Sequence, residues 1–315
     1  RSRISDTLGY RYFMDIGVPS PGTSFVEVTL EIKEYFPSSQ LGLYLMVQKP
    51  DTRWLNKSLG VKGGALLKPV TLDLLKFLGE DWSLYEAIYG PKTELNKAQQ
   101  KHIIDAAKWV TTLSGRASVE EFQRYFDLDN LARFFAGQVL LSNLDGILFN
   151  GQNFLMTLAP ETNVIGFAPW DLDHSWGEFF LTGTPEQRIH ASIHKPWIGD
   201  NFFVEKLFAI PAFKERSLQE IQSQVDKHFL PEKLSADIDH LASIIRPFVQ
   251  KEPAPRLEKF DIAVKAEFVP QQSSGNPMDP NRPVHQIKRF INERRASVLA
   301  QLAGEEEGVM ITFEQ

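Results

Sequence analysis

The stretch "GFAPWDLDHSWGEFF", residues 166–180, decides how the rest of the chain is interpreted. An apolar run ends at Trp170, and Asp171 and Asp173 follow it with one residue between them. His174 comes next, among further aromatic residues. Ionised carboxylates are costly in an apolar neighbourhood unless they are paired or bind a metal ion. This stretch is therefore the first candidate for a functional site.

The composition sets the limits of the interpretation. With 315 residues, of which 43% are hydrophobic, the chain is long enough for one large domain or two small ones with a sizeable core. Its net charge of −6 gives no indication of a nucleic-acid partner. No run of eighteen apolar residues occurs, so we expect no membrane span. The absence of cysteine excludes disulfides, thiolate metal sites and thiol nucleophiles.

The start of the chain leaves its compartment open. The first residue is Arg1, and no signal-peptide pattern follows it. We interpret the sequence as a trimmed or mature form. A protein without cysteine fits the cytosol and bacterial export equally well.

The first sixty residues have mixed α/β character. Residues 3–16 predict a short helix, and residues 24–36 and 41–49 predict two strands joined by a turn at 37–39. A short helix is expected to end at Gly60, and a glycine-bearing turn leads from it into another short extended piece.

The hydrophobic period becomes helical from about residue 95. The expected elements are a helix with an apolar face over 103–113, a helix started by a Ser-x-x-Glu capping box at Ser118, a central helix over 127–143, a two-stranded hairpin over 153–170, several helices after residue 200, a surface loop over 270–283 and a closing helix over 285–302. The pattern predicts an α+β protein with a smaller α/β amino-terminal part and a larger helical carboxy-terminal part.

Polar residues gather in the middle of this layout. Asn143 and Asp145 end the central helix, Asn150 and Asn153 follow, and the hairpin then leads to Asp171. Magnesium ions prefer hard oxygen ligands, usually one or two carboxylates together with phosphate oxygens and water. Phosphoryl transfer uses such ions and a separate carboxylate that orients the attacking group. Protein kinases carry these groups in the same sequence order, and Asp145 to Asn150 reproduces the four-residue gap of their catalytic loop.

The segment "GFAPWDLDHSWG" resembles the Trp-Asp-x-Asp signature of the spore coat protein H (CotH) kinase-like family, an atypical branch of the kinase fold. Four further segments resemble that family in the same order, so the likeness runs from about residue 10 to 303. They are "GLYLMVQKPDTRWLNKSLG", "DLDNLARFFAGQVLLSNLDG", "NFLM" and "FINERRASVLAQL". The resemblance implies a two-lobed protein-kinase-like fold, with a nucleotide-side lobe over 1–94 and a helical lobe over 95–315.

The resemblance also implies roles for individual residues. Asp145 matches the catalytic acid, and Asp171 matches the metal-binding acid after the second strand. Asp173 would be a second metal-binding or structural acid. For the metal-binding amide, Asn153 matches by the strand that follows it and Asn150 by spacing, and Asn153 is preferred. Lys68 matches a lysine that would contact the phosphates of the nucleotide.

The implied activity is ATP- and Mg²⁺-dependent phosphoryl transfer to a Ser or Thr hydroxyl of a protein substrate, and the implied location is extracellular or on a cell or spore surface. The sequence departs from the family at Gln48, where the family commonly has Glu, and in the seven residues between Asp145 and Asn153, where it more often has fewer. It also lacks a Gly-x-Gly-x-x-Gly loop, for which "KGGALLK" is a weak substitute, and a segment before Arg1 is a further candidate for nucleotide contacts.

Three other functions stay open on the sequence. A pseudokinase or surface adhesion module would keep the fold and bind a partner, and Gln48 and the longer loop favour it. Another ATP-using transferase on the same scaffold would add AMP or glutamate. A metal hydrolase would use Asp171 and Asp173 with His190 and His194, whose spacing places them on one face if they lie in a helix.

Overall fold

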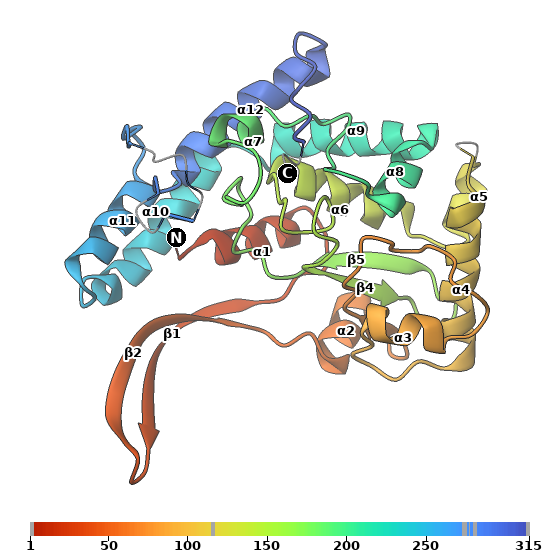
Figure 1. The fold of residues 1–315 in the computed structure, drawn as a ribbon, viewed down its shortest axis with the longest axis horizontal. Coiled ribbons are helices and arrows are strands. Elements are labelled where there is room, and N and C mark those ends of the chain that lie inside the picture. Colours follow the sequence, from red (N-terminus) through yellow and green to blue (C-terminus); the bar gives the residue numbers. More distant parts are fainter. Residues whose placement is uncertain (1–2, 115–116, 273–275, 277, 280–281, 313–315) are drawn as a thin grey trace.

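The computed structural model describes residues 3–114, 117–272, 276, 278–279 and 282–312. Its strands are β1 (Thr23–Ile32), β2 (Phe36–Val47), β3 (Ala65–Leu67), β4 (Phe154–Leu158) and β5 (Ile165–Pro169). Its helices are α1 (Ser5–Asp15), α2 (Thr52–Leu59), α3 (Ser83–Tyr89), α4 (Lys97–Thr112), α5 (Val119–Gln123), α6 (Leu128–Leu140), α7 (Pro185–Ile189), α8 (Phe202–Phe208), α9 (Pro211–Lys227), α10 (Pro231–Val249), α11 (Ala254–Val264) and α12 (Ile287–Ala303). Figure 1 shows their arrangement.

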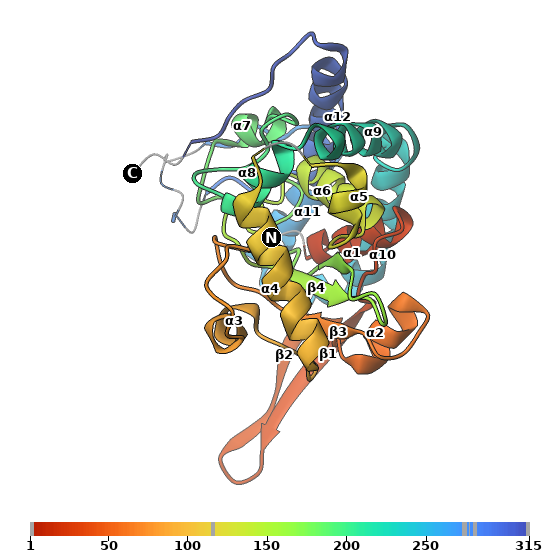
Figure 2. The same ribbon diagram turned by 90° about the vertical axis from the view of Figure 1, so that its right-hand side faces the viewer.

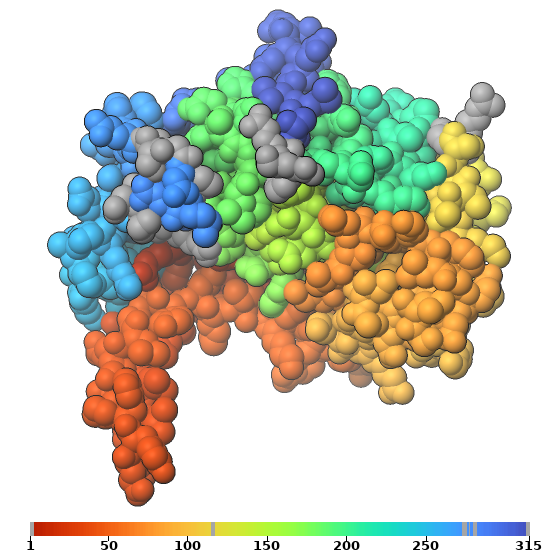
Figure 3. Space-filling view, in the orientation of Figure 1, coloured from red at the N-terminus to blue at the C-terminus, as the bar shows by residue number. Residues whose placement is uncertain are grey.

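The strands β1 and β2 form a long antiparallel ribbon that projects from the body of the molecule (Figures 1 and 3). The turn expected at residues 37–39 is wrong, because these residues lie inside β2. Ile32 pairs with Phe36, so the backbone reverses over the three residues between them, where Glu34 has a φ of 70°. Pro37 lacks an N–H group, and a two-stranded ribbon tolerates it because each strand has an unpaired edge.

A three-stranded antiparallel sheet in the order β3-β4-β5 lies inside the body. Every residue of its three strands is buried. The helices α6, α9 and α12 lie on one side of this sheet, and α2 and α3 lie on the other (Figures 1 and 2). The predicted hairpin over 153–170 is confirmed, with Phe154 paired to Pro169 and Leu158 to Ile165.

The helix α6 is the central helix that the sequence predicts. The carboxylate of Asp127 caps it by accepting a hydrogen bond from the N–H of Asn130. The Asn130 amide then bridges to β5, accepting from the Phe167 N–H (2.6 Å) and donating to the Phe167 C=O (3.1 Å). This bridge fixes the helix against the strand that leads to Asp171.

The helix α1 runs between the three-stranded sheet and the carboxy-terminal helices (Figures 1 and 2). Tyr12 and Phe13 are buried in one large hydrophobic cluster that extends from Ile4 to Ile311. The Tyr12 hydroxyl donates a hydrogen bond to Gln224 of α9 (3.0 Å). The beginning of the described sequence is therefore part of the main core.

The α+β prediction is confirmed. The division into lobes at residues 94 and 95 stays a prediction. The three-stranded sheet crosses this boundary, because β3 lies before it in the sequence and pairs with β4, which lies after it. The loop expected over 270–283 lies partly outside the described residues. None of the described helices is long and apolar enough to cross a membrane.

Candidate functional site

Two segments meet at the candidate site: the loop after α6 and the loop after β5. The N–H of Gly177 donates to the C=O of Leu141 (2.9 Å) and so ties the second segment to the end of α6. Asn143, which the sequence places among the polar residues of this region, is fully buried and donates to Gln138 (2.8 Å). Its Nδ2 group is therefore used to hold the end of the helix.

Asp145 lies in the first loop, and three side-chain amides donate to its carboxylate. Asn150 Nδ2 lies 2.7 Å and Gln152 Nε2 lies 3.1 Å from Oδ1, and Asn153 Nδ2 lies 3.2 Å from Oδ2. These three donors fix the orientation of the Asp145 carboxylate. A carboxylate offers about four acceptor positions, so Asp145 keeps room for one further partner.

Asn153 is held more firmly than Asn150. Asn153 is buried, and its Nδ2 also donates to the backbone carbonyl oxygen of Asp145 (2.9 Å). Its φ of 57° lies in the left-handed region, which Asn adopts more readily than most residues. Because both hydrogen bonds come from Nδ2, the Oδ1 atom is the ligand atom that Asn153 has left to offer a cation.

The second loop brings two more groups to Asp145. One ligand atom each from Asp145, Asp173 and His174 lies within 4.8 Å of the others. The His174 ring is buried against Phe179 and Phe180, with both pairs of ring centroids 5.6 Å apart, and its Nε2 lies 3.9 Å from Asp173 Oδ1. We call Asp145, Asp173 and His174 the acid cluster.

The helix α1 holds the start of the second loop. The N–H of Asp171 donates to the hydroxyl of Tyr10 (2.8 Å), and the N–H of Leu172 donates to Asp6 Oδ1 (2.9 Å). Asp171 has a φ of 50°, which is uncommon for residues other than glycine. These two hydrogen bonds stabilise the backbone in that conformation.

Asp171 belongs to the same electrostatic environment as the acid cluster. Burial raises the pKa of its carboxyl above the usual value, and the negative charges of Asp173 and Asp145 raise it further. The cationic Lys68, from the end of β3, and His174 lower the pKa of Asp171. The structure thus brings Lys68, Asp145, Asn153, Asp171 and Asp173 into one region, although β3 and the two loops are far apart in the sequence.

The residues present fit a divalent cation. The carboxylates of Asp145 and Asp173 in the acid cluster, like the Asn153 carbonyl, are hard oxygen donors of the kind that Mg²⁺ prefers, while Asp171 is not one of the residues whose ligand atoms lie within 4.8 Å of one another. The imidazole of His174 is a donor that suits transition metals better.

Two features that the sequence raised lie outside this arrangement. Gln48 accepts a hydrogen bond from the N–H of Gly22 (3.2 Å) at the base of the ribbon. The helix α7 ends at Ile189, so His190 and His194 do not share a helical face. His190 Nδ1 lies 2.7 Å from Glu306 instead.

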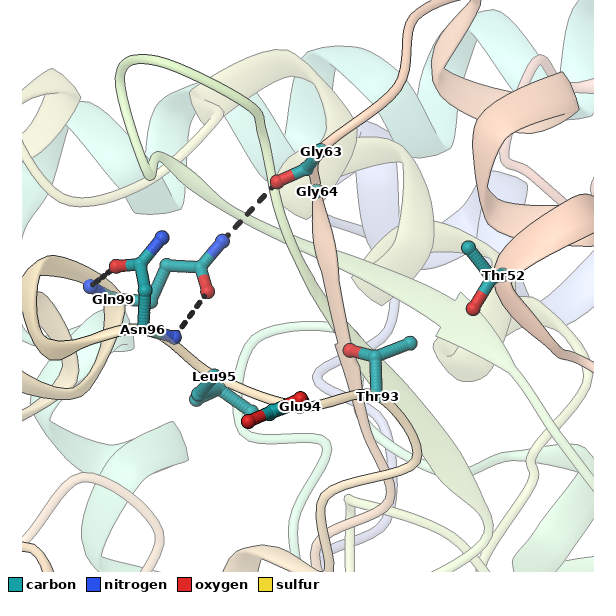
Figure 4. Close-up of a pocket in the computed structure, with 8 residues that line it drawn as sticks. All are labelled: Thr52, Gly63, Gly64, Thr93, Glu94, Leu95, Asn96 and Gln99. Atoms are coloured by element: carbon teal, nitrogen blue, oxygen red, sulfur yellow. Dashed lines mark hydrogen bonds between the residues drawn. The ribbon is translucent and has the colours of Figure 1, made fainter.

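The glycine turn that replaces a phosphate loop lines a separate pocket of about 410 Å³ (Figure 4). Neither Lys68 nor any residue of the two loops that form the candidate site lines this pocket. The C=O of Gly63 accepts from Gln99 (3.2 Å), and Gln99 also accepts from the N–H of Asn96. The carboxylate of Glu94 lies at this pocket as well, so its lining gives no support for phosphate binding.

Sequence reasoning missed three residues that shape the site: Gln152, Asp6 and Tyr10. Gln152 lies between two amides already under consideration, so its position in the loop was a usable signal. Asp6 and Tyr10 lie more than 130 residues before the acid cluster. No local pattern links them to it.

Comparisons with known proteins agree with the sequence motifs. A family model described as "CotH kinase protein" matches residues 1–298. The inner spore coat protein H of Bacillus subtilis (strain 168) is 24% identical over 267 residues, which cover 82% of this chain and 69% of that protein.

Proposed function

The chain belongs to the CotH kinase protein family, and from that premise we propose that it transfers the γ-phosphoryl group of ATP to a Ser or Thr hydroxyl of a protein, with Mg²⁺. The observations that carry the proposal are the acid cluster, in which ligand atoms of Asp145 and Asp173 lie close together, and the electrostatic coupling of Asp171 to these two acids and to Lys68. In a two-lobed arrangement, Lys68 comes from the lobe over 1–94 and the acids from the lobe over 95–315.

Asp145 is the proposed catalytic acid. The acceptor hydroxyl would donate its hydrogen bond to the remaining acceptor position of this carboxylate. Three amide donors hold the carboxylate in place, so it orients the hydroxyl with little loss of freedom at the moment of reaction. Because phosphoryl transfer is catalysed mainly by positioning and electrostatic stabilisation, Asp145 would act mainly by orienting the hydroxyl and accepting its proton.

Asn153, Asp171 and Asp173 are the proposed ligands of Mg²⁺, and Lys68 is the proposed contact to the phosphates. Mg²⁺, when bound, supplies positive charge that neutralises the phosphate oxygens during transfer. In the free protein, repulsion from the negative charge of Asp173 raises the pKa of Asp171. A bound cation removes that repulsion, which favours binding.

The test uses the wild-type protein with Mg²⁺ and ATP and two variants. Asp171→Asn removes a proposed metal ligand. The control, Asp105→Asn, removes a carboxylate on α4 that pairs with Lys101 (2.8 Å). We expect Mg²⁺-ATP to raise the melting temperature of the wild type and of Asp105→Asn, but not that of Asp171→Asn. An equal shift in all three proteins would remove the assignment of Asp171.

The added mass on a protein acceptor defines the group transferred. A gain that corresponds to phosphate supports the proposal, whereas AMP or glutamate would identify another ATP-using modification. No shift with Mg²⁺-ATP in the wild type would favour a pseudokinase or surface adhesion module, which the loss of the usual Glu at Gln48 also favours.

A metal hydrolase is the other candidate that a specific observation favours, because an imidazole belongs to the acid cluster. It predicts that Zn²⁺ or Mn²⁺ raises the melting temperature without nucleotide, and that His174→Gln abolishes this rise. For the location of the protein, we propose a spore or cell surface, since the B. subtilis relative is a spore coat protein.

A further inference from the structure

A second cavity begins at the acid cluster. It is a groove of about 660 Å³, and His174 is one of the residues that line it. The other walls come from residues 178, 180–186 and 188–189, from Lys259 in α11, and from residues 268–269, 271, 276, 282–286 and 289–290. His174 is the one member of the acid cluster that lines the groove, so a molecule in the groove would meet the acid cluster at this residue.

The groove differs in charge from the rest of the protein. Four cationic groups line it, against two carboxylates, while the whole sequence has a net charge of −6. The cations are Arg188, Arg282, Arg289 and Lys259, and the carboxylates are Glu178 and Glu186. A cleft lined by an excess of one charge raises the local concentration of ligands of the opposite charge. The groove therefore favours an anionic ligand.

Arg282 is the cation best placed to bind such a ligand. Its guanidinium lies 3.9 Å from the centroid of the Phe180 ring, which in turn packs on His174. A guanidinium that stacks on a ring keeps its in-plane N–H donors for a carboxylate. Among the residues that the structure describes, no carboxylate forms an ion pair with Arg282.

The other arginines of the groove are already used. Arg289 pairs with Glu186 and Glu293, and it stacks on Phe268 (4.3 Å). Arg188 is buried and donates to the C=O groups of Gly177, Thr182 and Gly183, so it holds the groove wall together. Arg282 is thus the contact that would decide which ligand is preferred.

Building on the proposed function, we infer that this groove binds the acceptor protein as an extended segment, and that Arg282 selects a segment with Asp or Glu a few residues from the acceptor hydroxyl. An extended segment advances about 3.3 Å per residue. The hydroxyl would lie at the acid cluster, and the acidic group would pair with Arg282 beyond the Phe180 ring. The apolar rings of Phe180 and Phe268 would contact the residues between and around them.

Binding is measured without nucleotide or metal, so that the result does not depend on phosphoryl transfer. Labelled short peptides carry Ala at the acceptor position and differ only in a flanking residue, which is Glu, Gln or Lys. Fluorescence anisotropy gives their dissociation constants. We expect the Glu peptide to bind most tightly and the Lys peptide most weakly, with a preference that weakens as salt is added.

Two variants of Arg282 and one control test the residue itself. We expect Arg282→Gln to weaken binding of the Glu peptide about three- to fivefold, as for a partly exposed ion pair, and Arg282→Glu to reverse the preference in favour of the Lys peptide. Arg53→Gln removes a positive charge of the same kind from α2, where the Arg53 side chain is 94% exposed. This control should leave the affinity for the Glu peptide unchanged.

Equal affinity for the three peptides, or an unchanged preference in Arg282→Glu, would overturn the inference. Tighter binding of the Lys peptide by the wild type would overturn it as well. If the Glu peptide binds as expected but its Ser version receives no phosphoryl group with Mg²⁺-ATP, the proposed function fails and the groove assignment stands.

Discussion

Replacing Asn153 tests how the candidate catalytic loop is held. The residue is buried, it donates from Nδ2 to the backbone carbonyl and to the carboxylate of Asp145, and its φ is 57°. Asn153→Ala removes both hydrogen bonds and places a residue with a Cβ atom, but no polar group, in the left-handed region. We expect this variant to fold with lower stability.

The magnitude follows from three contributions: the two hydrogen bonds and the backbone conformation. The neutral hydrogen bond contributes about 1 kcal/mol and the charge-assisted one about 1.5 kcal/mol, at the lower end because of its 3.2 Å length. The left-handed backbone costs Ala about 1 kcal/mol. The expected loss for Asn153→Ala is therefore about 3–4 kcal/mol of unfolding free energy.

Two further variants separate these contributions. Asn153→Gly also loses both hydrogen bonds but tolerates the positive φ, so it should be about 1 kcal/mol more stable than Asn153→Ala. Asn150→Ala removes one charge-assisted hydrogen bond of 2.7 Å to Asp145 from a half-buried residue and should cost about 1.5 kcal/mol. Urea unfolding followed by circular dichroism, without metal, gives all the values.

Two results would refute this reasoning. An Asn153→Ala variant as stable as the wild type would show that the amide does not anchor the loop. An Asn153→Gly variant less stable than Asn153→Ala would show that the positive φ is not maintained in solution.

Three further predictions concern stability. Asp171→Asn should raise the free energy of unfolding in metal-free buffer by about 0.5 kcal/mol. The pKa of Asp171 is raised, so its ionised form is disfavoured in the folded state. The stabilisation by Asp171→Asn should therefore grow as the pH rises through that pKa and vanish in acid. Arg294→Met should cost about 3–5 kcal/mol, since the buried guanidinium donates to three backbone C=O groups, while Arg256→Met, at an exposed position, should change urea stability little. Burial lowers the pKa of His285 to about 3, so the folded state excludes the proton that the unfolded state takes up below about pH 6.5. The free energy of unfolding should therefore fall by up to about 1.4 kcal/mol per pH unit as the pH drops from about 6.5 towards 3. In urea titrations at several pH values, His285→Phe should show a smaller loss over this range.

The helices and the buried hairpin could be predicted because their signals are local. Asp127 before α6 and the Ser118 capping box each fix a helix start from residues that adjoin in sequence. The turn at 37–39 failed for the opposite reason. Pro-Ser-Ser has the composition of a turn, but the register that pairs Ile32 with Phe36 places the reversal four residues earlier, over residues 33–35.

The sequence indicates the two loops of the candidate site, but not the contacts that bring them together. The loop with Asp145 and Asn153 and the loop with Asp171 and Asp173 each follow a recognisable element. The contacts of Tyr10 and Asp6 with the second loop depend on how α1 packs against the core. The place of His174 in the acid cluster depends equally on tertiary structure, because it requires two loops to meet.

The ribbon of β1 and β2 has a practical consequence for handling the protein. Each strand keeps an outer edge of backbone N–H and C=O groups, and Leu30, Ile32, Tyr44 and Met46 are exposed along the ribbon. Such an edge is a template on which a strand of a neighbouring molecule can add. Concentrated samples would then self-associate through the ribbon, and a lysine in place of Leu30 should act as a gatekeeper that keeps them dispersed.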